Sequence, residues 1–213
     1  MLVDHFPPYG IRLRTPRLEL RLPTDEELAA LADVAAEGVH DPAAMPFTVA
    51  WTDLPPAERA RSVVLHHWAV LGRFTAAEWT LPFTVFVDGE PVGQQSIDAR
   101  RFAVSRQVGT GSWLGKRHHG RGIGTEMRAA VLEFAFTGLG AEVATSSAFT
   151  DNPASLAVSR KLGYRPDGTA REVVRDRLAI SQRLRLTRED WAAHRAIEVS
   201  LDGVRPCLPL LCR

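Results

Sequence analysis

The sequence lacks the features that mark membrane, disulfide-rich and nucleic-acid-binding proteins. It has no run of about 18 apolar residues, so we expect no membrane-spanning helix. Its N-terminus, MLVDHFPPYG, does not show the basic-then-apolar pattern of a secretion signal. With 26 basic and 25 acidic residues the formal net charge is +1, whereas a dedicated nucleic-acid binder is markedly basic. We therefore expect a cytoplasmic protein, with no membrane and no nucleic acid among its partners.

Cysteine is also scarce. Only Cys207 and Cys212 occur, both near the C-terminus. Two cysteines do not imply a disulfide framework, and no paired set of histidines accompanies them as zinc ligands would require. We therefore expect no metal.

A chain of 213 residues with 45% hydrophobic and 24% charged residues suits one globular domain over residues 1–213, without internal repeats.

The most informative stretch lies between residues 107 and 136. Residues 107–114 alternate in the manner of a strand, residues 116–124 are basic and rich in glycine, and residues 125–136 have the apolar spacing of a helix. A glycine-rich turn at a helix N-terminus is suited to anions, because its N–H groups are free and the helix dipole adds positive potential. The basic cluster is formed by Lys116, Arg117, His118, His119 and Arg121. We interpret it as phosphate-binding because glycines are interleaved with it.

Two familiar phosphate motifs do not fit this stretch. A dinucleotide fingerprint, G-x-G-x-x-G, fails because Leu114 and Met127 stand where the third glycine would be. A P-loop, G-x-x-x-x-G-K-[ST], fails because Thr110 and Arg117 stand at two of its fixed positions.

A third motif fits. The run from His119 to Gly124, HGRGIG, resembles the pyrophosphate loop [QR]-x-x-G-x-[GA] of the GCN5-related N-acetyltransferase (GNAT) superfamily, with His119 in place of Gln or Arg. The Thr125-Glu126 that follows is similar to the RimJ/RimL-type branch, as is the opening TPRLELR at residues 15–21. Residues 151–164, DNPASLAVSRKLGY, resemble the second signature of the family, N-x-x-S followed by K-L-G-[FY]. The resemblance covers about residues 10–190, with specific motifs only in 107–164.

The second signature is also readable as local structure. Asn152 is a favoured helix N-cap, and Pro153 suits the first helical turn. Gly163 is typical of a helix end in the left-handed region. We therefore expect a short helix between these residues.

The resemblance implies an α/β fold with a GNAT-type central sheet. The sheet is expected to be twisted, mostly antiparallel, of about six to seven strands and splayed at the middle, with helices on both faces; the interleaved strands and helices of the sequence predict the same layers. The implied activity is N-acyl transfer from acetyl-CoA or another acyl-CoA to a primary amine by direct attack in a ternary complex, with residues 107–164 as the acyl-CoA-binding core. A non-catalytic CoA-binding sensor or scaffold is the alternative.

The resemblance also implies roles for individual residues. Backbone groups of Trp113, Leu114 and Gly115 would pair with the pantetheine arm and donate to the thioester oxygen. The pyrophosphate would be held by His119, Gly120, Arg121, Gly122, Ile123, Gly124 and Thr125.

Two residues of the second signature have alternative roles. Asn152 would contact the pantetheine arm, or only cap its helix. Many family members place at position 159 a tyrosine that protonates the leaving thiolate, but this chain has Ser159. Ser155 is therefore the candidate proton donor, unless its hydroxyl only caps the helix.

Several assignments stay open. Glu126, His40, Asp41 and His118 are candidate general bases, although Glu126 also suits the first helical turn electrostatically, and a water-mediated base is a further alternative. Residues Met45, Phe47 and Trp51 either line the acceptor pocket or pack on the core. The acceptor, the acyl group (acetyl, succinyl or other) and the oligomeric state, for which a homodimer is considered, are not determined by the sequence.

The remaining elements follow from periodicity and turn residues. We expect strands at 12–22, 81–87, 92–99, 142–149, 164–168 and 176–186, with Asp88-Gly89 as a hairpin turn between the second and third. A helix from a Thr24–Glu27 capping box to Gly38 and a helix at 58–74 are expected, with a loop at 40–56 and a short connection at 100–106. Thr187 and Asp190 indicate the start of a last helix, and the segment 197–213 either pairs at a sheet edge or reaches a partner subunit.

Overall fold

The computed structural model describes all 213 residues and has one nine-stranded sheet at its centre. The strand order is β7-β8-β6-β5-β4-β3-β2-β1-β9. The strands are β1 (Arg12–Arg14), β2 (Leu18–Arg21), β3 (Glu78–Val87), β4 (Glu90–Arg100), β5 (Gln107–Leu114), β6 (Val143–Phe149), β7 (Arg165–Val174), β8 (Arg177–Thr187) and β9 (Ser200–Asp202). The expected mixed α/β fold with a mostly antiparallel sheet is confirmed, and the sheet has nine strands rather than six or seven.

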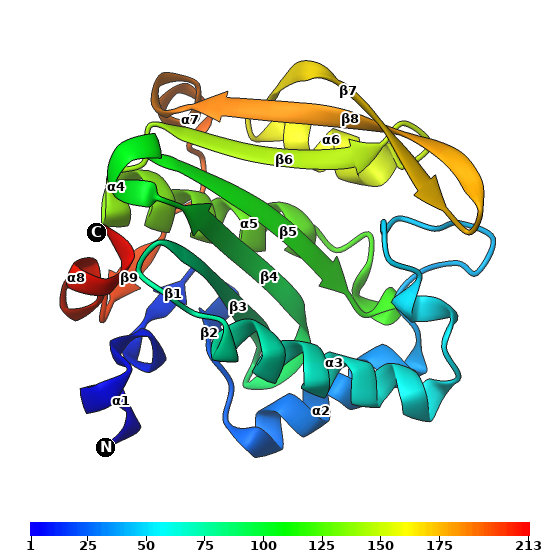
Figure 1. The fold of residues 1–213 in the computed structure, drawn as a ribbon, viewed down its shortest axis with the longest axis horizontal. Helices are drawn as coiled ribbons and strands as arrows, with labels where there is room; N and C mark the ends of the chain where they lie inside the picture. Colours follow the sequence, from blue (N-terminus) through cyan, green and yellow to red (C-terminus); the bar gives the residue numbers. More distant parts are fainter.

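Helices cover both faces of this sheet (Figure 1). They are α1 (Leu2–His5), α2 (Asp25–Glu37), α3 (Pro56–Gly72), α4 (Phe102–Ser105), α5 (Ile123–Glu133), α6 (Pro153–Lys161), α7 (Arg188–His194) and α8 (Leu208–Leu211). Neighbouring side chains of β5 show the two layers, since Trp113 packs against the cluster between α2 and α3, whereas Leu114 packs with Ile123 and Met127 of α5. The sheet is thus enclosed between the α2–α3 pair and α5, which continues as a π-helical segment, Phe134–Leu139.

The sheet opens between β5 and β6. These two strands are the parallel pair of the sheet, and they are hydrogen-bonded only from Gln107↔Val143 to Gly109↔Thr145. Beyond that point β5 continues to Leu114 beside β4, while β6 continues to Phe149 beside β8. The expected splay is confirmed, and it leaves one edge of each strand without a strand partner.

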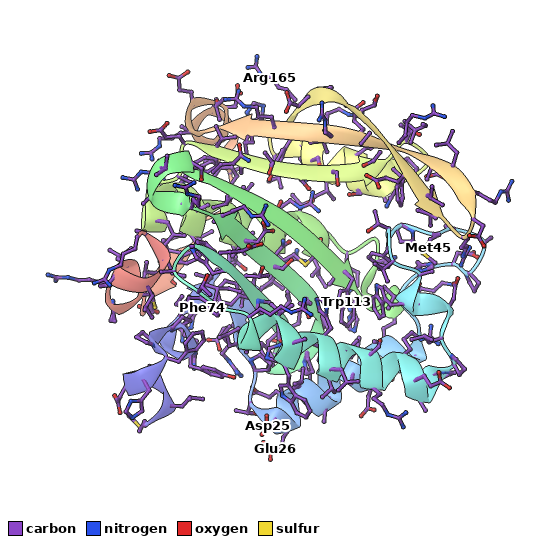
Figure 2. The ribbon with its side chains drawn as sticks, viewed as in Figure 1. Asp25, Glu26, Met45, Phe74, Trp113 and Arg165 are labelled. Atoms are coloured by element: carbon purple, nitrogen blue, oxygen red, sulfur yellow. The ribbon has the colours of Figure 1, made fainter.

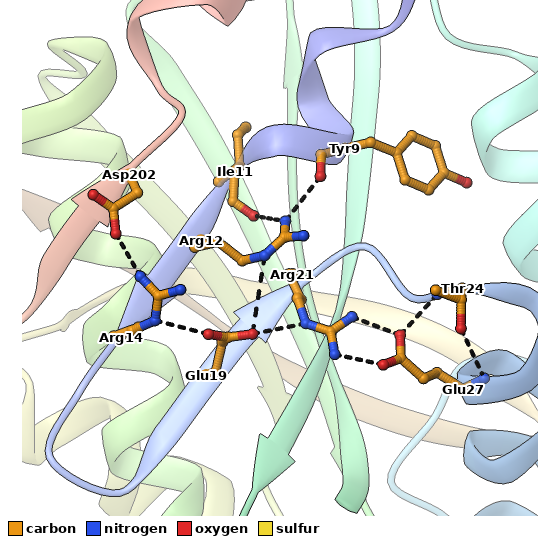
Figure 3. Close-up of polar contacts among 9 residues, drawn as sticks. All are labelled: Tyr9, Ile11, Arg12, Arg14, Glu19, Arg21, Thr24, Glu27 and Asp202. Carbon is orange, nitrogen blue, oxygen red and sulfur yellow. Dashed lines mark hydrogen bonds and ion pairs between the residues drawn. The ribbon is translucent and has the colours of Figure 1, made fainter. Parts of the chain in front are cut away.

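The N-terminal strand predicted at 12–22 is two strands. Thr15 and Leu18 close a turn, since the Thr15 N–H donates to the Leu18 carbonyl, and β1 then pairs antiparallel with β2. Pro16 interrupts the alternation because it has no N–H to donate. The solvent-facing arginines and carboxylates of both strands form a ladder of ion pairs that also reaches α2 and β9 (Figure 3).

Several local predictions are confirmed. The Thr24–Glu27 capping box starts α2, and Asp88-Gly89 joins β3 to β4 with both residues at positive φ. Thr187 accepts from the Asp190 N–H at the start of α7. The loop expected at 40–56 contains only a short 3-10 turn at Trp51–Asp53.

Other segments differ from the prediction. The connection at 100–106 contains the short helix α4, and β7 runs from Arg165 to Val174 instead of ending near residue 168. The C-terminal segment agrees with one of its two predicted alternatives, because it pairs at the sheet edge, where β9 joins β1, and its Cys207 and Leu211 are fully buried. No helix has the length and apolarity needed to span a bilayer.

Candidate active site in the gap between β5 and β6

A cleft with a volume of about 980 Å³ lies where the sheet opens. It extends from the N-terminus of α5 to the loop between α2 and α3, and Figure 2 shows Met45 of that loop and Trp113 of β5 on the same side of the molecule. Nearly all of the residues expected to form the site line this cleft: Trp113, Leu114, His119, Gly120, Gly122, Ile123, Gly124, Thr125, Asn152 and Ser155. Gly115 and Arg121 are not among its lining residues.

The free edge of β5 offers backbone groups at alternate residues. The Gly115 N–H donates to the Val92 carbonyl at 2.9 Å, so it points toward the β4 side. Because the groups of an antiparallel strand alternate in direction, Ser112 and Leu114 turn their N–H groups to the gap, while Trp113 and Gly115 face β4. The expected donors at Trp113 and Gly115 are therefore corrected to Leu114, which was expected, and Ser112, which was not.

The glycine-rich loop has five consecutive N–H groups without a partner in the protein. These are the groups of residues 120–124, and none of them donates to a backbone or side-chain acceptor. Gly120 and Gly122 make this possible because both have positive φ, 73° and 80°, which a residue with a Cβ adopts only with strain. Helix α5 begins directly after Gly122, so its dipole adds to the positive potential there.

His119 connects this loop to the strand. Its Nε2 lies 3.1 Å from the Leu114 carbonyl oxygen, which is on the gap side of β5. The side chain at the first motif position thus fixes the loop against the end of β5. Arg121 points its carbonyl outward, where it accepts from Arg17 at 3.1 Å.

The helix α6 forms the opposite wall. The Asn152 side-chain oxygen accepts from the Ser155 N–H at 3.1 Å, which confirms the N-cap, and Asn152 lines the cleft as well. Gly163 ends the helix at φ 90°, as predicted. The Ser155 hydroxyl forms no hydrogen bond within the protein and is therefore available to a ligand.

The sequence reasoning missed Arg128. Its side chain is 5% exposed, lines the cleft and donates to Ser159 Oγ at 2.9 Å and to Ser112 Oγ at 3.3 Å. Its Nε has no partner, and it forms no ion pair. Burial lowers the pKa of this guanidinium. A signal did exist, because residue 128 falls at helical spacing with Val131, Leu132 and Ala135, which are buried on α5 and on the π-helical segment that continues it.

Glu126 does not face the cleft. It lies in the first turn of α5, where it accepts from Thr15 Oγ1 at 2.6 Å and from Arg17 Nε at 2.7 Å. Because both carboxylate oxygens are held by these groups, we discard Glu126 as a general base.

The other candidate bases line the cleft but are engaged locally. The His40 ring contacts the Asp41 carbonyl at 2.8 Å and Thr52 Oγ1 at 2.7 Å, which occupies both nitrogens. The Nε2 of His118 accepts from Arg117 Nε at 3.0 Å. Burial, followed by the positive charge of Arg117, lowers the pKa of His118. One oxygen of the Asp41 carboxylate accepts from the Ala43 N–H at 3.0 Å, whereas its other oxygen and the Nδ1 of His118 have no partner in the protein. Asp41 and His118 therefore stay candidate bases beside a water-mediated one.

An aromatic wall closes the remaining side. Phe47 and Trp51 have ring centroids 5.4 Å apart, and Trp51 lies 5.6 Å from Trp113. Met45, Phe47 and Trp51 line the cleft, and Phe47 and Trp51 also pack against the α2–α3 cluster. Packing on the core is thus confirmed for Phe47 and Trp51, and the acceptor-pocket role of the three residues stays a prediction. An ion pair between Arg175 and Asp53 fixes the loop to the β7–β8 hairpin.

Comparison with known proteins agrees with this geometry. Residues 17–165, more than half of the chain, match the family model described as an acetyltransferase (GNAT) domain. Among solved structures, the chain is similar to Mycobacterium smegmatis RimJ in complex with CoA-disulfide, at 22% identity and a TM-score of 0.65 over 90% of this chain and 97% of that one.

Two further structures have the same fold. RimL, a ribosomal L7/L12 alpha-N-protein acetyltransferase in complex with CoA, is 18% identical with a TM-score of 0.62 over 81% of this chain and 95% of that one. A chimera of the Vibrio cholerae spermidine N-acetyltransferase SpeG and hSSAT is 16% identical with a TM-score of 0.61 over 83% of this chain and 98% of that one. The presence of RimJ and RimL among the neighbours agrees with the branch that the sequence resembles.

Proposed function

We propose how acyl transfer proceeds in this cleft from the premise that the chain belongs to the acetyltransferase (GNAT) family and is an acyl-CoA-dependent N-acyltransferase. The pyrophosphate of CoA binds the free N–H groups of residues 120–124, and the pantetheine arm follows the edge of β5 past Leu114 to Ser112. The observation that carries this assignment is the row of five unpartnered N–H groups at a helix N-terminus beside the gap.

Acyl transfer then needs few groups, because the thioester is already activated. The Ser112 N–H donates to the carbonyl oxygen as negative charge develops there. The amine attacks in its neutral form and loses its proton to water, and Ser155 donates a hydrogen bond to the departing sulfur. Asn152 holds the pantetheine arm with the amide nitrogen that the helix cap leaves free.

The acceptor is a primary amine that enters along the aromatic wall. Met45, Phe47 and Trp51 form an apolar surface next to the end of β5, which suits the stem of an amine substrate. The printed names of the neighbours describe a ribosomal-protein acetyltransferase and a spermidine acetyltransferase, so a protein N-terminus and a polyamine are the two classes to test first.

The direct test measures free thiol released from acetyl-CoA and succinyl-CoA in the presence of amino-terminal peptides and polyamines. We expect turnover with at least one pair of donor and amine. The absence of turnover with every pair would instead support a CoA-binding module without catalysis. The Ser155→Ala variant separates the two functions. We expect its kcat to fall about tenfold with CoA affinity unchanged, whereas Ser62→Ala, on α3 outside the cleft, keeps full activity.

A further inference from the structure

The buried arginine of α5 has no counterion in the protein. Arg128 forms no ion pair, and its guanidinium contacts only two serine hydroxyls, from β5 and α6. Tyr164 is the one titratable group whose charge influences the pKa of Arg128, and the Tyr164 hydroxyl contacts Thr110 Oγ1 at 3.2 Å. A buried cation is energetically unfavourable unless an anion accompanies it. We therefore expect a ligand in the cleft that Arg128 lines to supply the negative charge.

The position of the guanidinium indicates which part of the ligand it faces. Its Nη2 contacts Ser112 Oγ, and Ser112 is the residue whose N–H faces the gap at the thioester. Its Nη1 contacts Ser159 Oγ, which in turn donates to the Ser155 carbonyl at 3.0 Å. Arg128 therefore reaches the wall formed by α6, beside Ser155, the residue that donates to the departing sulfur.

We propose that Arg128 stabilises the CoA thiolate as it leaves, a role that rests on the proposed acyl transfer. The amine nitrogen forms the C–N bond, the C–S bond breaks, and its electron pair stays on sulfur while the amine proton goes to water. A serine hydroxyl can hydrogen-bond to this thiolate but cannot neutralise it. The guanidinium, whose side chain is only 5% exposed, supplies the positive charge, and the thiolate takes a proton from water on release.

The test measures the pKa of the CoA thiol bound to the enzyme, by the ultraviolet absorbance of the thiolate. A thiol beside a buried cation titrates well below the usual value of about 8.5. We expect Arg128→Met to raise the pKa of the bound thiol by about one unit or more and to lower kcat about 100-fold with every acyl donor. Arg128→Lys, which keeps the charge, restores part of both. The exposed and unpaired Arg205 provides the control variant Arg205→Met, for which neither quantity changes.

The outcomes separate this role from its alternatives. Methionine replaces a buried charge with an apolar chain of similar length, so we expect Arg128→Met to fold. If it does not fold, the thiol pKa is compared between the wild type and Arg128→Lys. An unchanged thiol pKa in Arg128→Met overturns the proposal. A loss confined to succinyl-CoA, with acetyl-CoA unaffected, also overturns it and assigns Arg128 to an acyl carboxylate. Wild-type protein that does not bind CoA contradicts the proposed function itself.

Discussion

At the scale of single residues, Gly122 has the most demanding position in the loop. Its φ is 80°, a Cβ there would lie 3.3 Å from Arg17 Nη2, and the N–H groups on both sides are free. We predict that Gly122→Asp weakens CoA binding about 100-fold, because the carboxylate repels the pyrophosphate and the backbone is strained. Calorimetric titration with CoA measures this. Gly89→Asp, at φ 85° in the β3–β4 turn, adds the same strain away from the cleft and should leave CoA affinity unchanged; equal losses in both variants would contradict the assignment.

Residues with local tasks could be predicted from the sequence, and residues with distant partners could not. The Asn152 cap and the left-handed Gly163 depend on neighbours a few positions away, and both are confirmed. Glu126 was left among the candidate bases because its partner, Arg17, lies 109 positions away. Arg128 was missed because the two serines that it contacts lie 16 and 31 positions away in the sequence. Only the packing of α5 beneath β5 shows that it is buried.

At the scale of elements, helices α6 and α7 begin with the same kind of side-chain cap, but the two caps lie in different surroundings. Asn152 starts α6 and Thr187 starts α7, and each accepts from the N–H three residues ahead. We predict that Asn152→Ala and Thr187→Ala each lower the free energy of unfolding by about 1 kcal/mol. Only Asn152 lines the cleft, so only Asn152→Ala should also raise the Kd for CoA, about tenfold. Denaturation and calorimetry measure the two effects. An unchanged Kd in Asn152→Ala would reduce its role to the cap.

The boundaries of elements were predictable where the turn chemistry is local. The β3–β4 hairpin and the start of α2 agree with the sequence because Asp88-Gly89 and the Thr24–Glu27 box act within a few residues. The split of residues 12–22 comes from a local turn at Pro16 that the prediction overlooked, whereas the pairing of β9 with β1 depends on long-range contacts. The ion-pair ladder of Figure 3 shows this, since Arg14 contacts both Glu19 and Asp202.

At the scale of the whole molecule, stability should fall in mild acid. His67 on α3 is 1% exposed with an unpartnered Nδ1, and burial lowers its pKa from 6.5 to about 4. Because its pKa is lower in the folded state, the unfolded chain binds the proton more readily, and stability is lost as pH falls from 6.5 toward 4. We predict that His67 accounts for a loss of about 2 kcal/mol between pH 7 and pH 5.

His67→Leu should remove that part of the loss, as followed by urea denaturation at several pH values. His66 and His118, whose pKa values are also lowered by burial, remain in both proteins, so the difference isolates His67. His5→Gln, at an exposed position, is the control. A His67→Leu variant that loses as much stability as the wild type over this range would contradict the assignment.

The two ends of the chain lie on the same side of the molecule (Figure 1), yet they contribute differently to its stability. The C-terminal segment adds β9 to the sheet, buries Cys207 and Leu211 completely, and gives Trp79 Nε1 its acceptor, the Leu211 carbonyl, at 3.0 Å. Helix α1 at the other end has no buried residue.

We therefore predict that deleting residues 197–213 lowers the Tm by about 10 °C or more, because it exposes core side chains and leaves a buried indole N–H unpaired. Deleting residues 1–5 should change the Tm by about 2 °C or less. Differential scanning calorimetry compares the two truncated proteins. If the C-terminal deletion instead left the Tm unchanged and shifted the molecular mass in solution, the segment would serve a partner subunit and not the core of its own chain.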